Sequence, residues 1–552
     1  MDKEKLLRRA GERGVNPFVH TIVRGLLIPF FRVYFRLNAT GREALPKSGG
    51  VIFAPNHRSF LDPFVIAAAQ RRPVYFIAKK ELFLKNRLQS WLLNSVGAFP
   101  IDRGSGDAAS IDTARAILER GDCVMVFPEG TRVRPGPLGH PRRGFGRLAL
   151  ECGVPVVPVT VFGTDDIRRG WRVRPHRVRV AFGEPIGFPR TDQPSPALAK
   201  SVSDRVWPRV EQQWESFGGI GPVRRAAIIG AGSWGTSLAV VLSRSGVAVE
   251  LGCRSAEQAQ EVAERRENRR YLPGVELPQA IAVMRAVDLD PRHADVVCLA
   301  VPAGALPVVM AELGDRLGDR PSLLVMSKGL VAPGGELPSA FCAARAGGLP
   351  VACLGGPAHA ADALEHGASI VLAGVDANIL AQLRRVFVDA GFDVETSRDI
   401  TGVDLAGVAK NAAVLAAATA AISGPNASGA AAGKVFAEVA AYATALGADP
   451  RSWSGLAGAG DLVASVVAAG GRNRRAGEML ARGVPASDVQ PALGQVAEAL
   501  DTLPLLADAM RRERIAAPAV SELARVVAGE GSAAAFAEHV TRPRRIVGAR
   551  VV

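Results

Sequence analysis

A histidine and an aspartate near the start of the chain have side chains suited to proton transfer. His57 and Asp62 lie in the stretch APNHRSFLDPF, directly after the apolar run VIF. Five positions is a poor spacing for two side chains on one ideal helix. Because Pro63 suits the first position of a helix, we expect Asp62 to cap that helix and a bent loop to bring its carboxylate to the imidazole. Such a histidine can act as a general base on a hydroxyl, although for this fragment alone a loop histidine beside a plain capping aspartate is the simpler interpretation.

A second candidate site is a glycine-rich turn in the middle of the chain. In AAIIGAGSWGTSLAVVL an apolar run leads into Gly230, Gly232 and Gly235, and apolar residues at helical spacing follow. This order predicts a strand, a tight turn and a helix, the context in which such glycines bind a dinucleotide. The glycines let the backbone approach a pyrophosphate, and the amino end of the helix favours its charge. Ser233 and Trp234 lie within the turn and are predicted to contact the cofactor too.

The end of the next expected strand bears on which dinucleotide is bound. The strand VAVELGCRS has no acidic residue at its tip, since Glu250 lies inside the strand pattern. Arg254 and Ser255 stand at the tip instead and favour a 2′-phosphate. We therefore predict NADP, with NAD as the alternative. A solvated surface charge is the competing interpretation of Arg254.

A lysine within an apolar helical segment is the third candidate. Lys410 lies in GVAKNAAVLAAA, where a charged side chain has little reason to be unless it is paired or working. Burial lowers the pKa of a lysine and suits it to proton transfer. Taken alone, a salt-bridged lysine is the simpler interpretation.

Charge is concentrated in the front part of the chain. The protein has 552 residues, which is too many for one core, and a net charge of +14. Residues 1–220 carry a net charge of +15. A basic surface attracts nucleic acid, anionic lipid or anionic substrates, but the basic aromatic strands and recognition helices of nucleic-acid binders are missing from the sequence. The six cysteines show no metal-ligand spacing, so we expect no metal site and a reducing, cytosolic compartment.

The segment FVHTIVRGLLIPFFRVYFRL, residues 18–37, is apolar but carries three arginines and a proline. Three arginines make a membrane-spanning helix costly. A helix that lies in a membrane interface, with arginines reaching lipid phosphates, fits better, and an ordinary helix packed on its own domain is the alternative.

The alternation of strand and helix patterns predicts an α/β multidomain protein. We expect an amphipathic helical amino terminus at 1–40, an α/β domain at 41–215 and a Gly/Pro-rich linker at 216–223. A Rossmann-type domain with a doubly wound parallel sheet is predicted for 224–400, and an all-α domain for 401–552, where β-branched strands give way to Ala-rich helices.

The front part resembles the glycerolipid acyltransferase family, of the 1-acylglycerol-3-phosphate O-acyltransferase type. The blocks NHRSFLD, GAFPIDRG, FPEGTR and GVPVVPVTVFG carry this resemblance in order. It implies His57 as the base, Asp62 as its orienting partner, and acyl transfer from a coenzyme A or acyl carrier protein thioester. It also implies a glycerol-phosphate site formed by Arg103, Glu129, Gly130, Thr131 and Arg132. Guanidinium groups suit a phosphate.

The rear part is similar to NAD(P)-dependent glycerol-3-phosphate dehydrogenases across nearly all of 224–552. The blocks NRRYLPG, VMSKGL, LGGPAHA, GVAKNAAVLAAA, GLAGAGDLVAS and GRNRRAGEML occur in that order. The resemblance implies that Lys410 protonates the ketone oxygen of dihydroxyacetone phosphate and that Asp461 fixes Lys410. The further implied substrate contacts are Lys328, Gly356, Asn411, Asp461, Arg472 and Asn473, and the further implied cofactor contacts are Lys328, Ala360, Arg472 and Glu498.

Three departures from the dehydrogenase pattern weaken the prediction of full activity. Gly355 stands where the family has a serine, Gly471 replaces a serine before Arg472, and GKVF at 433–436 replaces Thr-Arg-Gly-Leu. The leading hypothesis is a bifunctional enzyme of phospholipid synthesis that is cytoplasmic and peripherally bound to an anionic membrane. A front domain that serves only as a membrane anchor is the main alternative. A homodimer is compatible with the sequence, and nucleic-acid binding is disfavoured.

Overall fold

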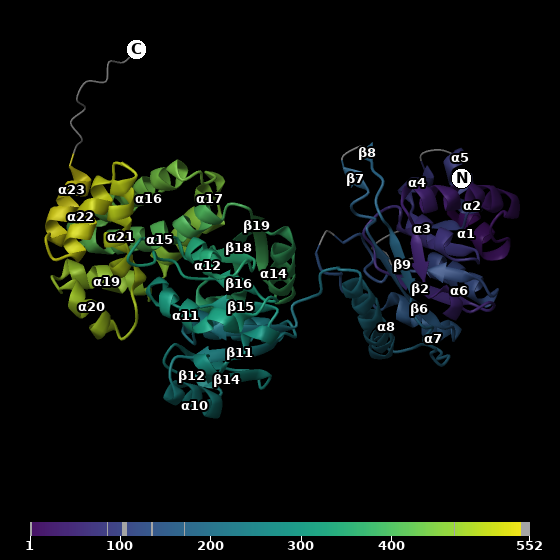
Figure 1. The fold of residues 1–552 in the computed structure, drawn as a ribbon, viewed down its shortest axis with the longest axis horizontal. Helices are drawn as coiled ribbons and strands as arrows, with labels where there is room; N and C mark the ends of the chain where they lie inside the picture. The colour runs from purple at the N-terminus through teal and green to yellow at the C-terminus, as the bar shows by residue number, and fades with distance from the viewer. Residues whose placement is uncertain are drawn as a thin grey trace, which may run out of the picture. The chain divides into compact units, whose positions relative to one another are not determined.

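The chain forms two compact units, Met1–Gly221 and Pro222–Val552 (Figure 1). The computed structural model describes residues 3–84, 87–101, 108–133, 136–169, 172–468 and 470–542. The division between the units falls within the Gly/Pro-rich stretch 216–223.

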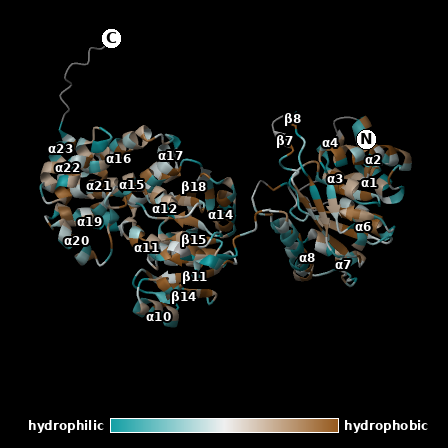
Figure 2. Cartoon of the chain, in the orientation of Figure 1, coloured by the Kyte–Doolittle hydropathy of each residue, from teal (hydrophilic) through white to brown (hydrophobic). Residues whose placement is uncertain are grey.

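The front unit is built on a seven-stranded, mostly parallel sheet of order β1-β9-β6-β2-β5-β3-β4, in which only the β6–β9 pair is antiparallel. Its strands are β1 (Asn38–Thr40), β2 (Val51–Pro55), β3 (Val74–Lys79), β4 (Ala98–Ile101), β5 (Cys123–Met125), β6 (Val156–Phe162) and β9 (Arg179–Phe182), and a separate hairpin joins β7 (Arg168–Arg169) to β8 (Arg172–Val173). Its helices are α1 (Lys3–Glu12), α2 (Pro17–Tyr34), η1 (Arg42–Ala44), α3 (Asp62–Ala69), α4 (Glu81–Leu84), α5 (Arg87–Ser95), α6 (Ala108–Glu119), α7 (Gly144–Cys152) and α8 (Pro196–Ser216). The sheet strands β2 and β5 are buried along their whole length, as strands covered on both faces must be, and Figure 2 shows hydrophobic residues along the central strands.

The predicted helical amino terminus forms two helices, α1 and α2, that are bent by 89° at a short break. Gly14 has a φ of +74°, which glycine adopts readily, and the Asn16 side chain accepts the amide N–H of Val19. Pro17 then opens α2. These residues end one helix and begin another, and the amino-terminal segment leads directly into strand β1.

The rear unit begins with a Rossmann-type domain on an eight-stranded sheet of order β14-β11-β10-β15-β16-β17-β18-β19. All neighbours are parallel except β17 and β18. The strands are β10 (Arg225–Ile229), β11 (Ala248–Cys253), β14 (Ile281–Arg285), β15 (Val296–Leu299), β16 (Ser322–Val325), β17 (Val351–Gly355), β18 (Ser369–Gly374) and β19 (Asp393–Ser397), and β12 (Glu267–Asn268) pairs with β13 (Leu272–Glu276) in a small ribbon. The helices are α9 (Ser233–Arg244), α10 (Ala256–Arg265), α11 (Leu306–Leu313), α12 (Pro338–Arg345), α13 (Ala360–His366) and α14 (Ala377–Asp389), with short 3-10 turns η2 (Ala286–Asp288), η3 (Pro291–His293), η4 (Ala303–Ala305) and η5 (Gly314–Leu317). The strand order reverses between β10 and β15, where doubly wound sheets bind ligands.

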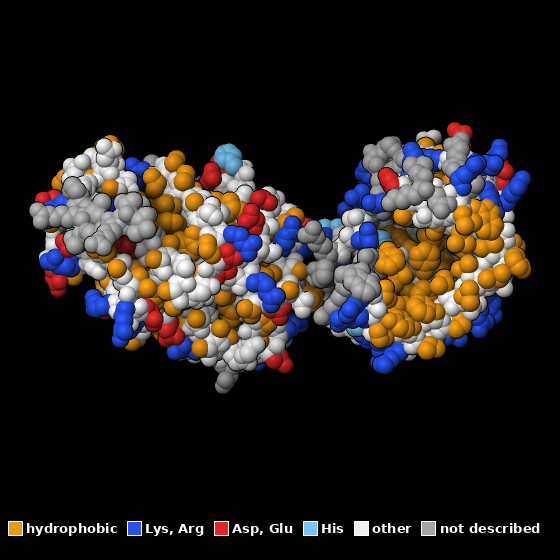
Figure 3. Space-filling model, turned by 90° about the horizontal axis from the view of Figure 1, so that it is seen from above, with side chains coloured by type: hydrophobic (Ala, Val, Ile, Leu, Met, Phe, Trp, Pro, Cys, Tyr) orange, Lys and Arg blue, Asp and Glu red, His pale blue; other side chains and the backbone are white. Residues whose placement is uncertain are grey.

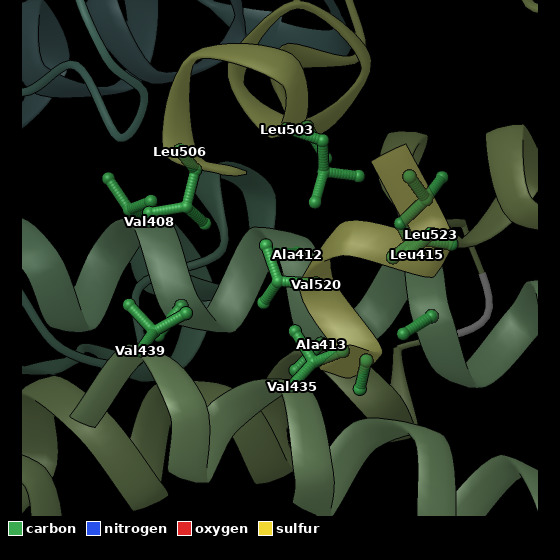
Figure 4. Close-up of a cluster of buried hydrophobic side chains, with 14 of the residues drawn as sticks. Val408, Ala412, Ala413, Leu415, Val435, Val439, Leu503, Leu506, Val520 and Leu523 are labelled. Atoms are coloured by element: carbon green, nitrogen blue, oxygen red, sulfur yellow. The ribbon is translucent and has the colours of Figure 1, made fainter. Parts of the chain in front are cut away.

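An all-α domain completes the rear unit around one central helix, α15 (Ile400–Ala420). The other elements are η6 (Ala421–Ser423), α16 (Pro425–Ala445), α17 (Arg451–Ser454), the π-helix η7 (Leu456–Gly460), α18 (Asp461–Val467), α19 (Arg472–Ala481), α20 (Ala486–Leu493), α21 (Glu498–Arg512), α22 (Pro518–Val527) and α23 (Ala533–Thr541). Figure 4 shows Val408, Ala412 and Leu415 of α15 among side chains from α16, α21 and α22.

By length and composition, the described part of the chain has one helix able to cross a membrane, Ile400–Ser423, or up to three if each bent helix pair is counted as one span. In the structure 78% of the apolar window of Ile400–Ser423 is buried within the protein. The apolar surface of α15 is therefore used in the core of the helical domain, and Lys410 is carried into that core with it.

Candidate active sites

The structure brings His57 and Asp62 together. The imidazole Nδ1 lies 2.8 Å from Asp62 Oδ2, and the Asp62 carboxylate is fully buried. The imidazole stacks on Phe127, with ring centroids 4.0 Å apart, and its side chain is 11% exposed. A buried carboxylate on one ring nitrogen leaves the other nitrogen to face a substrate hydroxyl, which is the arrangement that a general base needs.

Asp62 does not cap helix α3, which corrects the sequence-based expectation. It is the first residue of α3, whose cap position is Leu61 and has no side-chain cap. The Asp62 carboxylate turns back to accept the amide N–H groups of Arg58 and Ser59, each at 2.7 Å, and the Thr164 hydroxyl donates to it at 2.6 Å. The carboxylate therefore folds the histidine loop onto the helix start.

The EGTR segment closes over the backbone of His57. The Glu129 carboxylate accepts the His57 N–H at 2.6 Å through Oε2 and the Gly139 N–H at 2.6 Å through Oε1. Val133 donates its amide N–H to the His57 carbonyl at 2.9 Å. Gly130 turns with a φ of +70°, and Thr131 and Arg132 are exposed between these two attachments. Arg103 lies outside the described residues.

This geometry gives Glu129 a supporting position that the sequence did not indicate. Its side chain is buried, and burial raises the pKa of Glu129 to about 7, although two amide N–H bonds and the charge of Arg58 act in the opposite direction. Both carboxylate oxygens are occupied by backbone donors. Arg132, by contrast, has its guanidinium free to meet a phosphate from solvent, as far as the described residues show.

The glycine turn lies at the point where the order of the rear sheet reverses. A Cβ on Gly230, whose φ is +109°, would come within 2.5 Å of the Ala300 carbonyl, and one on Gly235 within 1.9 Å of the Gly230 carbonyl. A Cβ on Gly232 would meet nothing within 4 Å. Gly230 and Gly235 are thus required by close packing, whereas Gly232 leaves open space at the amino end of α9. Ser233 and Trp234 form the first turn of this helix, and the cradle fits a pyrophosphate.

Several polar residues surround the turn. Arg254 follows β11 and is exposed, and Ser255 caps α10. Ala360 opens α13, and its carbonyl accepts the Ser237 hydroxyl at 2.7 Å. The amides of Gln258 and Asn268 both donate to the Ala231 carbonyl at 2.9 Å and so hold the turn in place. Neither support was predicted from the sequence, although Asn268 belongs to the NRRYLPG block.

Two lysines and one aspartate from distant segments meet in the rear unit. Lys328 Nζ donates to Asp461 Oδ2 at 2.6 Å, and Lys410 Nζ lies 3.5 Å from Asp461 Oδ1. Burial lowers the pKa of Lys410 to about 8, while Asp461 raises it and Lys328 lowers it further. Burial alone would raise the pKa of Asp461, but the two lysine charges outweigh it and hold that pKa below its usual range. The arrangement provides a buried ammonium that can release a proton near neutral pH.

The remaining predicted residues lie around this cluster. Asn411 Nδ2 donates to the Lys328 carbonyl at 2.8 Å, and Lys328 Nζ also lies 3.5 Å from the Gly356 carbonyl. Glu498 accepts the Ala303 N–H at 3.0 Å, which ties α21 to the Rossmann domain. The other two predicted residues, Arg472 and Asn473, are the first residues of α19.

Arg472, the first residue of α19, is exposed. Asn473 Oδ1 accepts the Ala499 N–H at 3.3 Å. Sequence reasoning also missed His359, whose buried Nε2 has no hydrogen-bond partner within the described part of the chain and whose charge would act on Asp461.

The rear unit also holds a pocket of about 840 Å³ between the β18–β19 edge and the helical domain. Ser397, Asp399 and Leu456 are among its lining residues, whereas Lys328, Lys410 and Asp461 are not. It shares the π-helix η7 with the lysine cluster, because Asp461 directly follows that helix. We place the chemistry at the lysines, since the functional groups converge there.

The rear unit thus has the fold of a dinucleotide-dependent oxidoreductase, with two lysines on one buried aspartate, and the front unit is an α/β domain with a histidine–aspartate pair. The chain belongs to the NAD-dependent glycerol-3-phosphate dehydrogenase family, with an acyltransferase domain in front. The family models for the amino- and carboxyl-terminal parts of NAD-dependent glycerol-3-phosphate dehydrogenase match residues 225–380 and 399–538, and the model for acyltransferases matches residues 36–162. These matches confirm the predicted fusion and its fold classes.

Relatives and a solved structure agree with the dehydrogenase assignment. A glycerol-3-phosphate dehydrogenase [NAD(P)+] of Chlorobium limicola is 36% identical over 303 residues, which cover 53% of this chain and 90% of that protein. The solved glycerol-3-phosphate dehydrogenase of Coxiella burnetii is 27% identical, with a TM-score of 0.56, and covers 58% of this chain and 99% of its own. The 1-acyl-sn-glycerophosphate acyltransferase of Thermotoga maritima is 25% identical over 38% of this chain and 87% of its own, with a TM-score of 0.30.

Proposed function

We propose that the rear unit reduces dihydroxyacetone phosphate to sn-glycerol 3-phosphate with NADPH or NADH. The observation that carries this proposal is the convergence of Lys410, Lys328 and Asp461 beside the carboxyl ends of the Rossmann strands. The bound dinucleotide supplies the hydride. The residues that would bind it are those of the glycine turn, with Ser233 and Trp234 at the start of α9.

The chain's own residues supply the proton and the orientation. Lys410 gives its proton to the ketone oxygen as that oxygen gains electrons, and Asp461 holds the ammonium in position. Lys328 is anchored on the second oxygen of Asp461 and presents a positive charge beside the same substrate. Arg472 at the start of α19 provides the guanidinium for the substrate phosphate, with Asn473 beside it.

The pH dependence of the two reaction directions is expected to be opposite. Reduction needs protonated Lys410, whose pKa burial lowers to about 8, so kcat for reduction should fall as pH rises through that value. Oxidation of sn-glycerol 3-phosphate needs the neutral amine, so its kcat should rise over the same range. Steady-state rates with saturating substrates in both directions test this. Parallel pH profiles would contradict a role for Lys410 as the proton donor.

Arg254 is expected to select the phosphorylated dinucleotide. Arg254→Gln should raise the KM for NADPH by about tenfold, the loss of one charge-assisted phosphate contact, and leave the KM for NADH nearly unchanged. The measurement is the ratio of kcat/KM for the two cofactors. Arg270→Gln is a matched control, since this arginine is also exposed and stacks on Tyr271. An unchanged ratio in Arg254→Gln would show that the arginine is a solvated surface charge.

We propose further that the front unit transfers an acyl group from a coenzyme A or acyl carrier protein thioester to a glycerol-phosphate acceptor. His57 takes the proton of the acceptor hydroxyl, the alkoxide oxygen attacks the thioester carbonyl, and the thiolate leaves. Asp62 keeps the imidazole oriented through the 2.8 Å contact. Arg132 and Arg103 are the proposed phosphate contacts, with Thr131 and Gly130 between Arg132 and Glu129.

Glu129 and Arg132 should give different kinetic signatures although they belong to one motif. Glu129→Gln places an amide N–H group against one of the two backbone N–H donors, so it should displace His57. We expect kcat to fall by about tenfold to a hundredfold, with little change in the acceptor KM. Arg132→Gln should mainly raise the acceptor KM. Initial rates at varied acceptor concentration separate the two. A raised KM in Glu129→Gln would instead support the substrate contact implied by the family resemblance.

The front unit is also proposed to rest on a membrane surface through α2. The side chains on one face of this helix are exposed although they are apolar: Phe18, Ile22, Leu26, Phe30 and Val33. They follow one another at spacings of three or four residues, so they form a single stripe. An apolar stripe on a basic unit is the pattern of a helix that lies in a lipid interface. A vesicle co-sedimentation assay tests this part of the proposal.

A coupled assay distinguishes the bifunctional enzyme from a dehydrogenase with a membrane anchor. Purified protein is given NADPH, dihydroxyacetone phosphate and a labelled acyl thioester. Labelled lysophosphatidate would show consecutive reactions, and acylation only after lysophosphatidate is added would show that another enzyme acts between them. No acyl transfer under any lipid condition would favour the anchor.

A further inference from the structure

A short arginine-rich hairpin projects from the front unit and is not used by either proposed reaction. We call it the arginine arm and define it by the described residues 166–169 and 172–177, which include β7 (Arg168–Arg169) and β8 (Arg172–Val173). Its sequence holds five arginines and one aspartate. The hairpin is closed by the β7–β8 pairing and by the Arg174 N–H, which donates to the Ile167 carbonyl at 2.8 Å. A small two-stranded hairpin thus carries an unusual density of positive charge.

Three arginines in the second half of the arm face solvent. Arg172, Arg174 and Arg177 are exposed. The guanidinium groups of Arg174 and Arg177 make no hydrogen bond or ion pair to any described residue. Arg179, just beyond the arm, differs because it stacks on Phe162 and Phe217 at 4.7 and 4.5 Å. The arm therefore offers forked donors that the fold itself leaves unused.

The arm lies against the end of the apolar stripe of α2. The Tyr34 hydroxyl donates to the Val173 carbonyl at 3.1 Å, so the last residue of α2 touches β8. Val33, the neighbour of Tyr34, is 80% exposed, and Val173 is 44% exposed. Figure 3 shows hydrophobic side chains gathered on one face of the front unit, with Lys and Arg side chains around them. The apolar stripe of α2 and the arginine arm are therefore adjacent on the surface of the front unit.

The arm is also connected to the histidine–aspartate pair. Thr164, whose hydroxyl donates to Asp62 at 2.6 Å, stands two residues before the arm. The arm therefore begins within two residues of a side chain that supports Asp62.

We propose that the arginine arm binds the phosphate groups of anionic lipids in the membrane on which the α2 stripe rests. This inference depends on the membrane docking proposed for α2. Guanidinium groups match phosphate oxygens in pairs, and an anionic leaflet attracts basic segments near its surface. An acidic carrier protein could also attract arginines, but it would leave the adjoining apolar stripe uncovered. The bilayer is the partner that accounts for both surfaces.

The test uses the full chain and vesicles of phosphatidylcholine with or without phosphatidylglycerol. Arg174→Gln/Arg177→Gln should lower affinity for the anionic vesicles by about 20- to 30-fold, since each arginine near the surface contributes about fivefold. The matched control Arg143→Gln/Arg209→Gln removes two exposed arginines elsewhere on the unit and should have a much smaller effect. Dehydrogenase activity and acyl transfer to a soluble short-chain acceptor should stay unchanged in both.

The outcomes separate this inference from the proposal on which it rests. If Leu26→Ser/Val33→Ser abolishes vesicle binding while the arm variant binds like wild type, docking by α2 stands and the arm inference fails. If wild type binds neither kind of vesicle, both fail. If the arm variant keeps vesicle binding but loses activity only with an acyl carrier protein thioester, the arm recognises an acidic protein and the lipid assignment is overturned. Equal losses in the arm variant and the control would show charge attraction without a site.

Discussion

Lys410→Met is expected to lower kcat for dihydroxyacetone phosphate reduction by about 10² to 10⁴, the usual contribution of a positioned general acid. Methionine keeps much of the length of the lysine but has no proton to give. The site should keep its shape, because Asp461 retains its 2.6 Å bond to Lys328. Steady-state oxidation of NADPH measures the effect. The KM values should change far less than kcat, since the lost interaction strengthens only as the ketone oxygen gains charge.

Two controls make the result for Lys410 decisive. Acyl transfer by the same preparation should match wild type, because the front unit has its own core. Cofactor binding, measured by fluorescence quenching, should also be unchanged. A variant that retains more than about a tenth of the wild-type kcat would rule out Lys410 as the main proton donor.

His57→Ala is expected to reduce acyl transfer by about 10² to 10⁴ and to leave the dehydrogenase rate unaffected. The imidazole is the only base in direct contact with the buried Asp62 carboxylate within the described residues, and the loop that carries it is held by hydrogen bonds at His57, Arg58 and Ser59. Release of free thiol from an acyl thioester, monitored with a soluble acceptor, measures the rate.

Two further variants test whether the effect is specific to His57. His176→Ala removes another histidine of the front unit, one that lies 3.7 Å from Asp166 and is partly exposed, and should keep full acyl transfer. Asp62→Asn should also lower acyl transfer, because a neutral amide does not stabilise the imidazolium that forms when His57 takes the proton. Full acyl transfer in His57→Ala would remove the catalytic assignment and favour the anchor hypothesis.

The variants Lys410→Met and His57→Ala serve as controls for each other. Each should abolish one activity of the chain and spare the other, a pattern that misfolding of the whole protein does not produce. The same pair tells whether product passes between the units: a mixture of the two variants should restore the coupled reaction if sn-glycerol 3-phosphate diffuses freely. No recovery in the mixture would indicate that the two steps require one chain.

Local sequence patterns predicted most of the elements and part of the chemistry. The glycine turn, its flanking strand and helix, and the pairing of His57 with Asp62 depend on residues close together in the chain, so the local pattern of glycines, apolar residues and Pro63 predicted them. The two-unit organisation followed from composition. Local hydrophobic periodicity and turn residues act over a few positions, and these are the interactions that a single sequence displays directly.

The contacts between residues far apart in the sequence, and the hydrogen-bond partners of each polar group, depend on the tertiary structure. Lys328 and Asp461 are 133 positions apart, and they meet because Lys328 and α18 both lie against α15, where Asn411 donates to the Lys328 carbonyl. Burial in that core lowers the pKa of Lys410, which sequence neighbours could not fix. The two carboxylate oxygens of Glu129, which the family resemblance places at the substrate, accept backbone amides. Tyr34 joins α2 to the arginine arm across 139 positions. Desolvation and hydrogen-bond partners depend on the whole fold, so such roles become visible only when the chain is folded.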